Sequence, residues 1–176
     1  MKRASLLLSL LLIACQRDAA PAPAEGGLAP SASGLERAAI ETGVIADVRK
    51  VPPVGLYQRT HEAGRDILCV APDRSGHLRF GLEAVFGRQE SCRGQGMARN
   101  AGDKLILSFQ GGDKCLIVAQ YDGDQIMLPG VVDVSCASLC EGKGSLEGVS
   151  FPRIASMARA ALDARDRAGA ALCGGD

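Results

Sequence analysis

Seven cysteines offer this chain its widest choice of chemistry. Two of them, Cys136 and Cys140, are four positions apart, which would place both thiols one turn apart on a helix. A zinc site would need further cysteine or histidine ligands nearby, and the only histidines are His61 and His77. The spacing also differs from the C-x-x-C of thioredoxin-like redox enzymes. The pair therefore favours structural disulfides, and we expect no metal site.

The start of the chain has the pattern of an export signal. Lys2 and Arg3 precede a leucine-rich apolar run, residues 4–14, which is shorter than the roughly 20 residues needed to span a bilayer. The run closes with Leu12, Ile13 and Ala14, followed directly by Cys15. This stretch resembles the lipobox of bacterial lipoprotein signal peptides. The resemblance implies that residues 1–14 are a signal peptide and that Cys15 becomes the lipid-modified N-terminus.

A lipid on Cys15 would hold the protein on a membrane, since each buried CH2 contributes about 0.8 kcal/mol and several acyl chains together hold almost permanently. In such lipoproteins, Asp commonly follows the cysteine when the protein stays in the inner membrane, whereas this chain has Gln16. We therefore expect an anchor in the outer membrane, with the protein facing the periplasm. The alternative is an ordinary cleaved signal peptide in which Cys15 carries no lipid.

With Cys15 assigned to lipid, an even number of cysteines remains, and an exported chain with six cysteines is expected to form three disulfides. These six are Cys69, Cys92, Cys115, Cys136, Cys140 and Cys173. Six cysteines can pair in many ways, and the sequence does not choose among them. From its position at the end of the chain, we expect Cys173 to form a disulfide with Cys136 or Cys140.

Composition divides the rest of the chain into a tether and one domain. Residues 15–33 are dominated by Ala, Pro, Gly and Ser and predict a flexible tether. Residues 34–176 predict a single disulfide-stapled β domain. Lys and Arg together number 20, as do Asp and Glu, so no concentrated basic charge indicates nucleic-acid binding. The chain has no Trp, 2 Tyr and 4 Phe, too few for the aromatic platforms of many carbohydrate sites.

The middle of the chain alternates in the manner of β-strands. In residues 78–86, Leu78, Phe80, Leu82 and Ala84 share one face, a period of two that is difficult to interpret as helix. In residues 92–99, small residues occupy one face and permit tight curvature. The predicted strands are 56–60, 66–71, 78–86, 92–99, 104–110, 114–121 and 125–128. Short turns between them predict an antiparallel meander that forms a small barrel or half-barrel, with an open sheet or sandwich as the alternative.

Two helices are expected to flank this mainly β fold. Ser33 and Glu36 form a capping box that predicts a short helix over residues 35–42. Residues 152–168 place Ile154, Met157 and Ala161 on one helical face, between a proline that suits a helix start and Gly169 as a stop. We expect this C-terminal helix to pack on the barrel.

No catalytic or cofactor-binding motif emerges. Residues 142–145 resemble the end of a phosphate-binding loop, but no Ser or Thr directly follows Lys143. We expect neither catalytic residues nor a cofactor, and interpret the chain as a non-catalytic binding or structural module of the bacterial envelope with an envelope protein as partner. One alternative is an inhibitor of a cell-wall hydrolase such as lysozyme, since such inhibitors are often small lipid-anchored barrels. A weaker alternative is a carrier of a small apolar ligand inside the barrel.

Overall fold

The structure, a computed structural model, describes residues 34–111 and 114–174. The predicted signal peptide, Cys15, the tether and the capping residue Ser33 lie outside the described residues. The chain divides into two units, Met1–Arg37 and Ala38–Asp176. Helix α1 (Gly34–Glu41) confirms the predicted N-terminal helix. The barrel and its disulfides belong entirely to the second unit.

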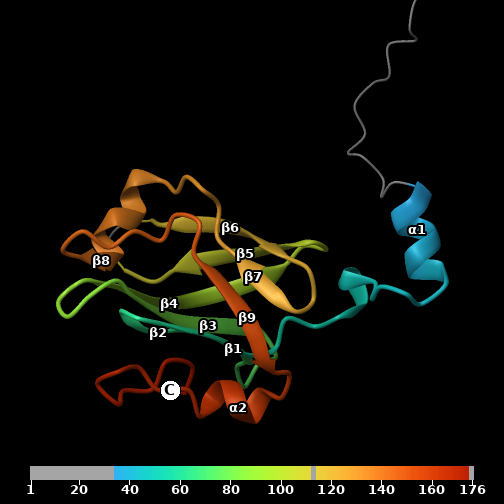
Figure 1. Cartoon of the computed structure of the whole chain (residues 1–176). Helices are drawn as coiled ribbons and strands as arrows, with labels where there is room; N and C mark the ends of the chain where they lie inside the picture. Colours follow the sequence, from blue (N-terminus) through green and yellow to red (C-terminus); the bar gives the residue numbers. More distant parts are fainter. Residues whose placement is uncertain (1–33, 112–113, 175–176) are drawn as a thin grey trace, which may run out of the picture. The chain divides into compact units, whose positions relative to one another are not determined.

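Eight strands form a closed antiparallel barrel (Figure 1). They are β1 (Gly55–His61), β2 (Gly64–Pro72), β3 (Leu78–Val85), β4 (Ser91–Asn100), β5 (Lys104–Phe109), β6 (Leu116–Tyr121), β7 (Gln125–Met127) and β9 (Ser150–Ala155). Strands β1 to β6 each pair with the next strand in sequence, and β9 closes the barrel by pairing with β7 and with β1. All seven predicted strands and the barrel are confirmed, and the barrel is complete rather than half-open.

Alternation along the strands fills the inside of the barrel. On β3, the inward residues Phe80, Leu82 and Ala84 are buried, as the period of two predicts. The same inward core contains Tyr57, Leu68, Leu105, Leu107, Ile117, Tyr121, Ile126 and Phe151. On β4 the inward positions are small, because a Cβ on Gly96 would clash with the carbonyl oxygen of Ser108 and one on Gly94 with the ring of Phe109. The interior is therefore a packed core.

The predicted helix over residues 152–168 is wrong at both ends, and only residues 158–162 are helical. Residues 150–155 form β9, and the C-terminal helix α2 is only Ala158–Leu162. Ile154 and Met157, which the helical pattern assigned to a buried face, are 53% and 67% exposed. Phe151 is instead fully buried, because barrel closure requires an eighth strand that pairs on both sides. After α2 the chain continues as an irregular C-terminal tail, residues 163–174.

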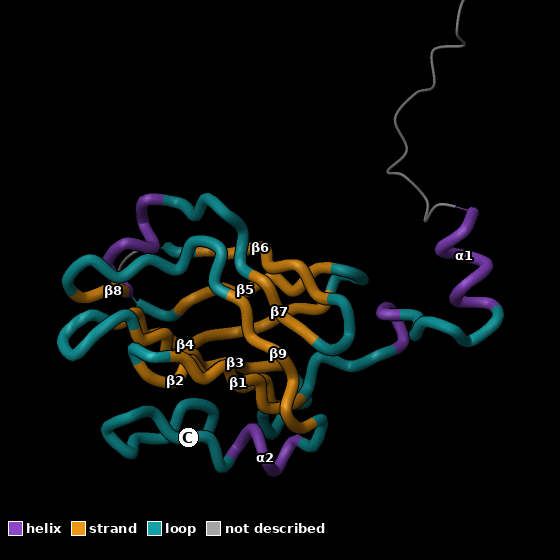
Figure 2. Tube along the Cα trace, in the orientation of Figure 1, coloured by secondary structure: helices purple, strands orange, loops and turns teal. Residues whose placement is uncertain are grey.

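Each end of the barrel is crossed by a different segment. Residues 51–53, which precede β1, cross one end, which we call the proline end. The long connection between β7 and β9, residues 128–149, crosses the other, which we call the plug end, and carries the 3-10 helix η2 (Val134–Leu139) and the short strand β8 (Cys140–Glu141) (Figure 2). Leu128, Leu146 and Val149 of this connection are buried in the barrel core. The plug end is thus closed by apolar contacts.

Three disulfides attach the plug-end connection and the C-terminal tail to the barrel, and three is the number that the cysteine count predicted. Cys92/Cys140 and Cys115/Cys136 attach the plug-end connection, with Cα–Cα distances of 3.9 and 4.8 Å. Strand β8 pairs with the start of β4 at the first of these bridges.

The third disulfide joins Cys69 to Cys173, so the expectation that Cys173 pairs with Cys136 or Cys140 is wrong. The reason lies in the position of the tail. Helix α2 and the tail cover the outside of β2, where the outward side chain of Cys69 belongs to a second apolar cluster with Ala161 and Leu172. The nearest thiol to the chain's end is therefore on the sheet.

Candidate ligand-binding groove on the outside of the barrel

A polar cluster closes the proline end of the barrel. Tyr57 donates a hydrogen bond to the carbonyl of Pro53 at 2.8 Å, and Tyr121 donates to the carbonyl of Pro52 at 3.1 Å. The Arg153 guanidinium donates to Tyr57 Oη at 2.7 Å, to Tyr121 Oη and to Pro52 O at 2.8 Å. Burial raises the pKa of both tyrosines, so their hydroxyls stay protonated as donors. This network fixes residues 51–53 over the barrel mouth.

A second polar cluster lies at the plug end around Asp66, which is 1% exposed. Its carboxylate accepts from Arg59 Nη2 at 2.7 Å, from the backbone N–H of Val85 at 2.8 Å and lies 3.0 Å from His61 Nε2. Every contact compensates the cost of burying this charge. The cluster therefore stabilises the end of the barrel.

The same cluster contains the elements of a serine–histidine site, but not their arrangement. Ser150 Oγ accepts from Arg59 Nη1 at 3.4 Å, and within the described part of the chain no hydrogen bond joins it to His61. A serine and a histidine do form a contact elsewhere: Ser75 Oγ lies 3.2 Å from His77 Nδ1. This contact belongs to an exposed turn in which the Asp73 carboxylate accepts the backbone N–H groups of Ser75 and His77. Neither arrangement has the geometry of a nucleophile activated by a base.

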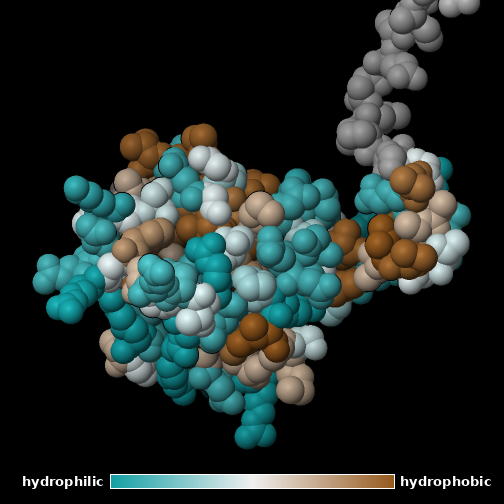
Figure 3. Space-filling view, viewed as in Figure 1, coloured by the Kyte–Doolittle hydropathy of each residue, from teal (hydrophilic) through white to brown (hydrophobic). Residues whose placement is uncertain are grey.

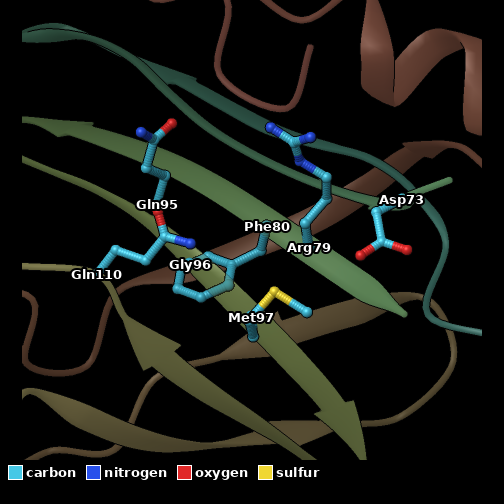
Figure 4. A pocket seen from close by; sticks show the side chains of 7 residues that line it. All are labelled: Asp73, Arg79, Phe80, Gln95, Gly96, Met97 and Gln110. Atoms are coloured by element: carbon cyan, nitrogen blue, oxygen red, sulfur yellow. The ribbon is translucent and has the colours of Figure 1, made fainter. Parts of the chain in front are cut away.

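Hollows on the outer surface follow strand β4 and together form what we call the β4 groove. The first, of about 270 Å³, is lined by Asp73, Arg79, Phe80, Gln95, Gly96, Met97 and Gln110 (Figure 4). A second, of about 290 Å³, shares Gln95 with the first and adds Arg93, Gly94, Ala171 and Leu172. A third, of about 170 Å³, shares Arg93 with the second and reaches Ser91. The groove thus follows β4 from Met97 to Ser91.

Two amide side chains, one thioether and two oppositely charged side chains line the first hollow. Gln95 and Gln110 are exposed, and the backbone N–H of Gln110 donates to the carbonyl of Gln95 at 2.8 Å. In Figure 4 their side chains lie with Arg79 and Asp73 around Phe80 and Met97. Hydrogen bonds from the Ser75 hydroxyl and from nearby backbone amides lower the pKa of Asp73, so this rim residue is ionised at neutral pH.

The C-terminal tail forms one wall of the groove and is held by ion pairs. Arg93 pairs with Asp166, whose side chain is fully buried. Arg167 lies 3.9 Å from Glu83, and its guanidinium also donates to Ser91 Oγ at 3.3 Å. Arg93, Arg167 and Glu83 in this part of the groove are therefore paired within the protein.

The structure brings the sequence-predicted site residues together only in part. Cys136 and Cys140 bind different partner cysteines, and in the described residues no three His, Cys, Asp or Glu side chains cluster as metal ligands. The sequence did not predict the groove residues as a site. The alternation of residue types along β4 indicates only that Gln95 and Met97 face outward.

Across residues 34–111 and 114–174, no helix has the length and apolar character needed to span a membrane. No protein-family model matches the chain, and no curated protein or solved structure is significantly similar to it.

Proposed function

We propose that the chain is a lipid-anchored protein of the bacterial envelope whose barrel is a non-catalytic binding module that acts through its outer surface. The observation that carries the proposal is the filled interior. Leu82, Leu107 and Phe151 are fully buried inside the barrel, and both ends are closed by fixed segments. A partner therefore meets only the outer face and the connecting loops. The same packing lends no support to the alternative of an apolar ligand carried inside.

The proposed location in the bacterial envelope rests on the resemblance of Leu12, Ile13, Ala14 and Cys15 to a lipobox. The three disulfides support it independently, because they use all six other cysteines and require an oxidising compartment. Gln16 favours the outer membrane. The proposed partner is an envelope protein.

Replacing Cys15 by Ser tests this address. In cells that produce the wild-type chain, we expect the protein in the membrane fraction and labelled by radioactive palmitate, because acyl chains on Cys15 anchor it. The Cys15→Ser variant is expected to lose the label and the membrane association. Cys115→Ser serves as a matched control, since it removes a disulfide cysteine and should leave the label in place. An unchanged fractionation of Cys15→Ser would refute the lipid anchor.

A second candidate function, inhibition of a cell-wall hydrolase, is favoured by the plug-end connection. Val131 and Val134 are 80% and 87% exposed, although the disulfides at Cys136 and Cys140 attach the same connection to the barrel. Figure 3 shows hydrophobic side chains on the surface at the upper left, over the plug-end connection. An exposed apolar loop that is fixed in advance loses little entropy when it enters a cleft. Such loops are typical of inhibitors that block an active site.

If this candidate is correct, the protein inhibits at least one lysozyme of a panel at micromolar concentration. The Val131→Asp/Val134→Asp variant should then lose at least about 10-fold in inhibition, because two charges would have to be buried in the cleft. Val44→Asp, a change at a valine that is also largely exposed, is the matched control. Absence of inhibition across the panel removes this candidate.

A further inference from the structure

We propose that the β4 groove binds an extended polypeptide segment and recognises it mainly through its backbone amides. The inference rests on the proposed function, for which it names the site and the class of partner. Three features of the described residues carry it: the way this face already holds the protein's own tail, the amide side chains of the groove, and the balance of its charges.

The outer face of the sheet already binds polypeptide backbone. The carboxylate of Glu83 accepts the backbone N–H of Arg167 at 2.8 Å, and the Arg65 guanidinium donates to the carbonyl of Arg165 at 3.5 Å. A Cβ on Gly81 would clash with the carbonyl of Leu172, so the two backbones are in direct contact. The face beside the groove thus holds a chain segment through backbone groups.

The groove continues this surface with side chains that match peptide groups. Each glutamine amide carries two donor hydrogens and one acceptor oxygen, the same functions as a peptide bond. Within the described residues, no hydrogen bond is formed by the side chain of Gln95 or Gln110. Met97, which is 39% exposed and lies two positions after Gln95 on β4, offers an adaptable apolar contact for side chains of the bound segment.

Length and shape fit an extended chain. The hollows follow β4 from Ser91 to Met97, which is about 20 Å at roughly 3.3 Å per residue. A bound segment of about seven residues in the extended conformation would cover this length. The tail residues Ala171 and Leu172 would flank it on one side.

The charges favour backbone recognition over recognition of a charged ligand. Arg93 is paired with Asp166, and Arg167 with Glu83. At the other end of the groove, the ionised Asp73 accompanies Arg79. An anionic or cationic partner would therefore gain little net attraction, whereas neutral amides would find donors and acceptors.

The aromatic lining of the groove favours a peptide over a sugar chain as the ligand. The aromatic lining residue of the first hollow is Phe80, which is 1% exposed and packs edge-to-face against Phe109 at 4.8 Å between ring centroids. It offers no open ring face on which a pyranose could stack. The lining residues of the groove thus favour a polypeptide.

A test uses the full-length, lipid-modified protein in detergent micelles and a phage-displayed library of random 10-residue peptides. We expect to select peptides with micromolar Kd by isothermal titration calorimetry. The Gln95→Ala/Gln110→Ala variant should weaken them at least about 10-fold, because several amide hydrogen bonds are lost. N-methylation of alternate backbone amides in a selected peptide should weaken binding similarly, which directly reports backbone recognition.

Gln120→Ala/Gln125→Ala, which removes two outward glutamines of β6 and β7, is the matched control and should leave the Kd unchanged. The inference is overturned if no selected peptide depends on Gln95 and Gln110, if N-methylation has no effect, or if a tetramer of N-acetylglucosamine binds the groove more tightly than any peptide. The Cys15→Ser experiment tests lipid modification and membrane association, and it does not test peptide binding in the groove. If the protein is lipid-anchored but binds no peptide, this inference is therefore refuted while the proposed membrane anchor stands.

Discussion

Removing the Cys69/Cys173 disulfide, as Cys69→Ala/Cys173→Ala, is expected to lower the free energy of unfolding by about 4 to 5 kcal/mol. The bridge closes a loop with a sequence separation of 104, the longest of the three, and therefore restricts the unfolded chain most. Its loss also releases the tail from the outside of β2, where Leu172 and Ala161 pack. Urea denaturation under non-reducing conditions, followed by circular dichroism, measures the change.

The matched control is the Cys115→Ala/Cys136→Ala variant, whose bridge has a sequence separation of 21. The shorter loop predicts a smaller loss, of about 3 kcal/mol. If the Cys69/Cys173 variant lost less stability than this control, the tail would not be a structural part of the folded domain.

The Asp66→Ala variant is expected to lose about 3 kcal/mol of unfolding free energy. Removal of the carboxylate leaves the backbone N–H of Val85 without its acceptor, Arg59 without its counter-charge and His61 Nε2 without its hydrogen-bond partner. The Arg59 side chain is 39% exposed and can regain some hydration, which limits the loss. The same denaturation experiment measures it.

Asp103→Ala is the control for this substitution. Asp103 forms an exposed ion pair with Lys104 at 3.6 Å, and its removal should change stability by less than about 0.5 kcal/mol. An Asp66→Ala variant as stable as Asp103→Ala would show that the plug-end cluster does not stabilise the barrel.

Strands with one apolar face turned to the barrel interior could be predicted from the sequence. In β3, Leu78, Phe80, Leu82 and Ala84 belong to that face and alternate with Arg79, Gly81 and Glu83, which produces the observed period of two. Turn residues such as Asp122 and Gly123 then set where the strands end. These local signals sufficed for seven strands and for the barrel.

Strand β9 could not be predicted in the same way. Its outward residue Ile154 remains exposed, and with Met157 and Ala161 it happens to follow a helical period. What makes residues 150–155 a strand is the pairing with both β7 and β1, a contact with residues far away in sequence. The local strand propensity of these residues does not indicate that they pair with β7 and β1 to close the barrel.

The candidate groove was beyond prediction for a related reason. Gln95 lies on β4 and Gln110 directly follows β5, so the two side chains come together only when β4 pairs with β5. One wall of the groove is formed by Leu172, from the distant C-terminal tail. The pairing of Cys173 with Cys69 depends on the same placement of the tail. Sequence spacing cannot report which outward faces are covered and which stay open.

The central proposal, a lipid-anchored barrel with a filled interior that acts through its outer surface, is tested most directly by mass spectrometry of the protein purified from its host's membranes. Under denaturing conditions, we predict the mass of the chain from Cys15 onward, with three disulfides and added acyl groups. Under native conditions in detergent, the barrel should carry no further apolar small molecule. An unmodified Cys15, or an apolar ligand that is released only when the barrel unfolds, would contradict the proposal.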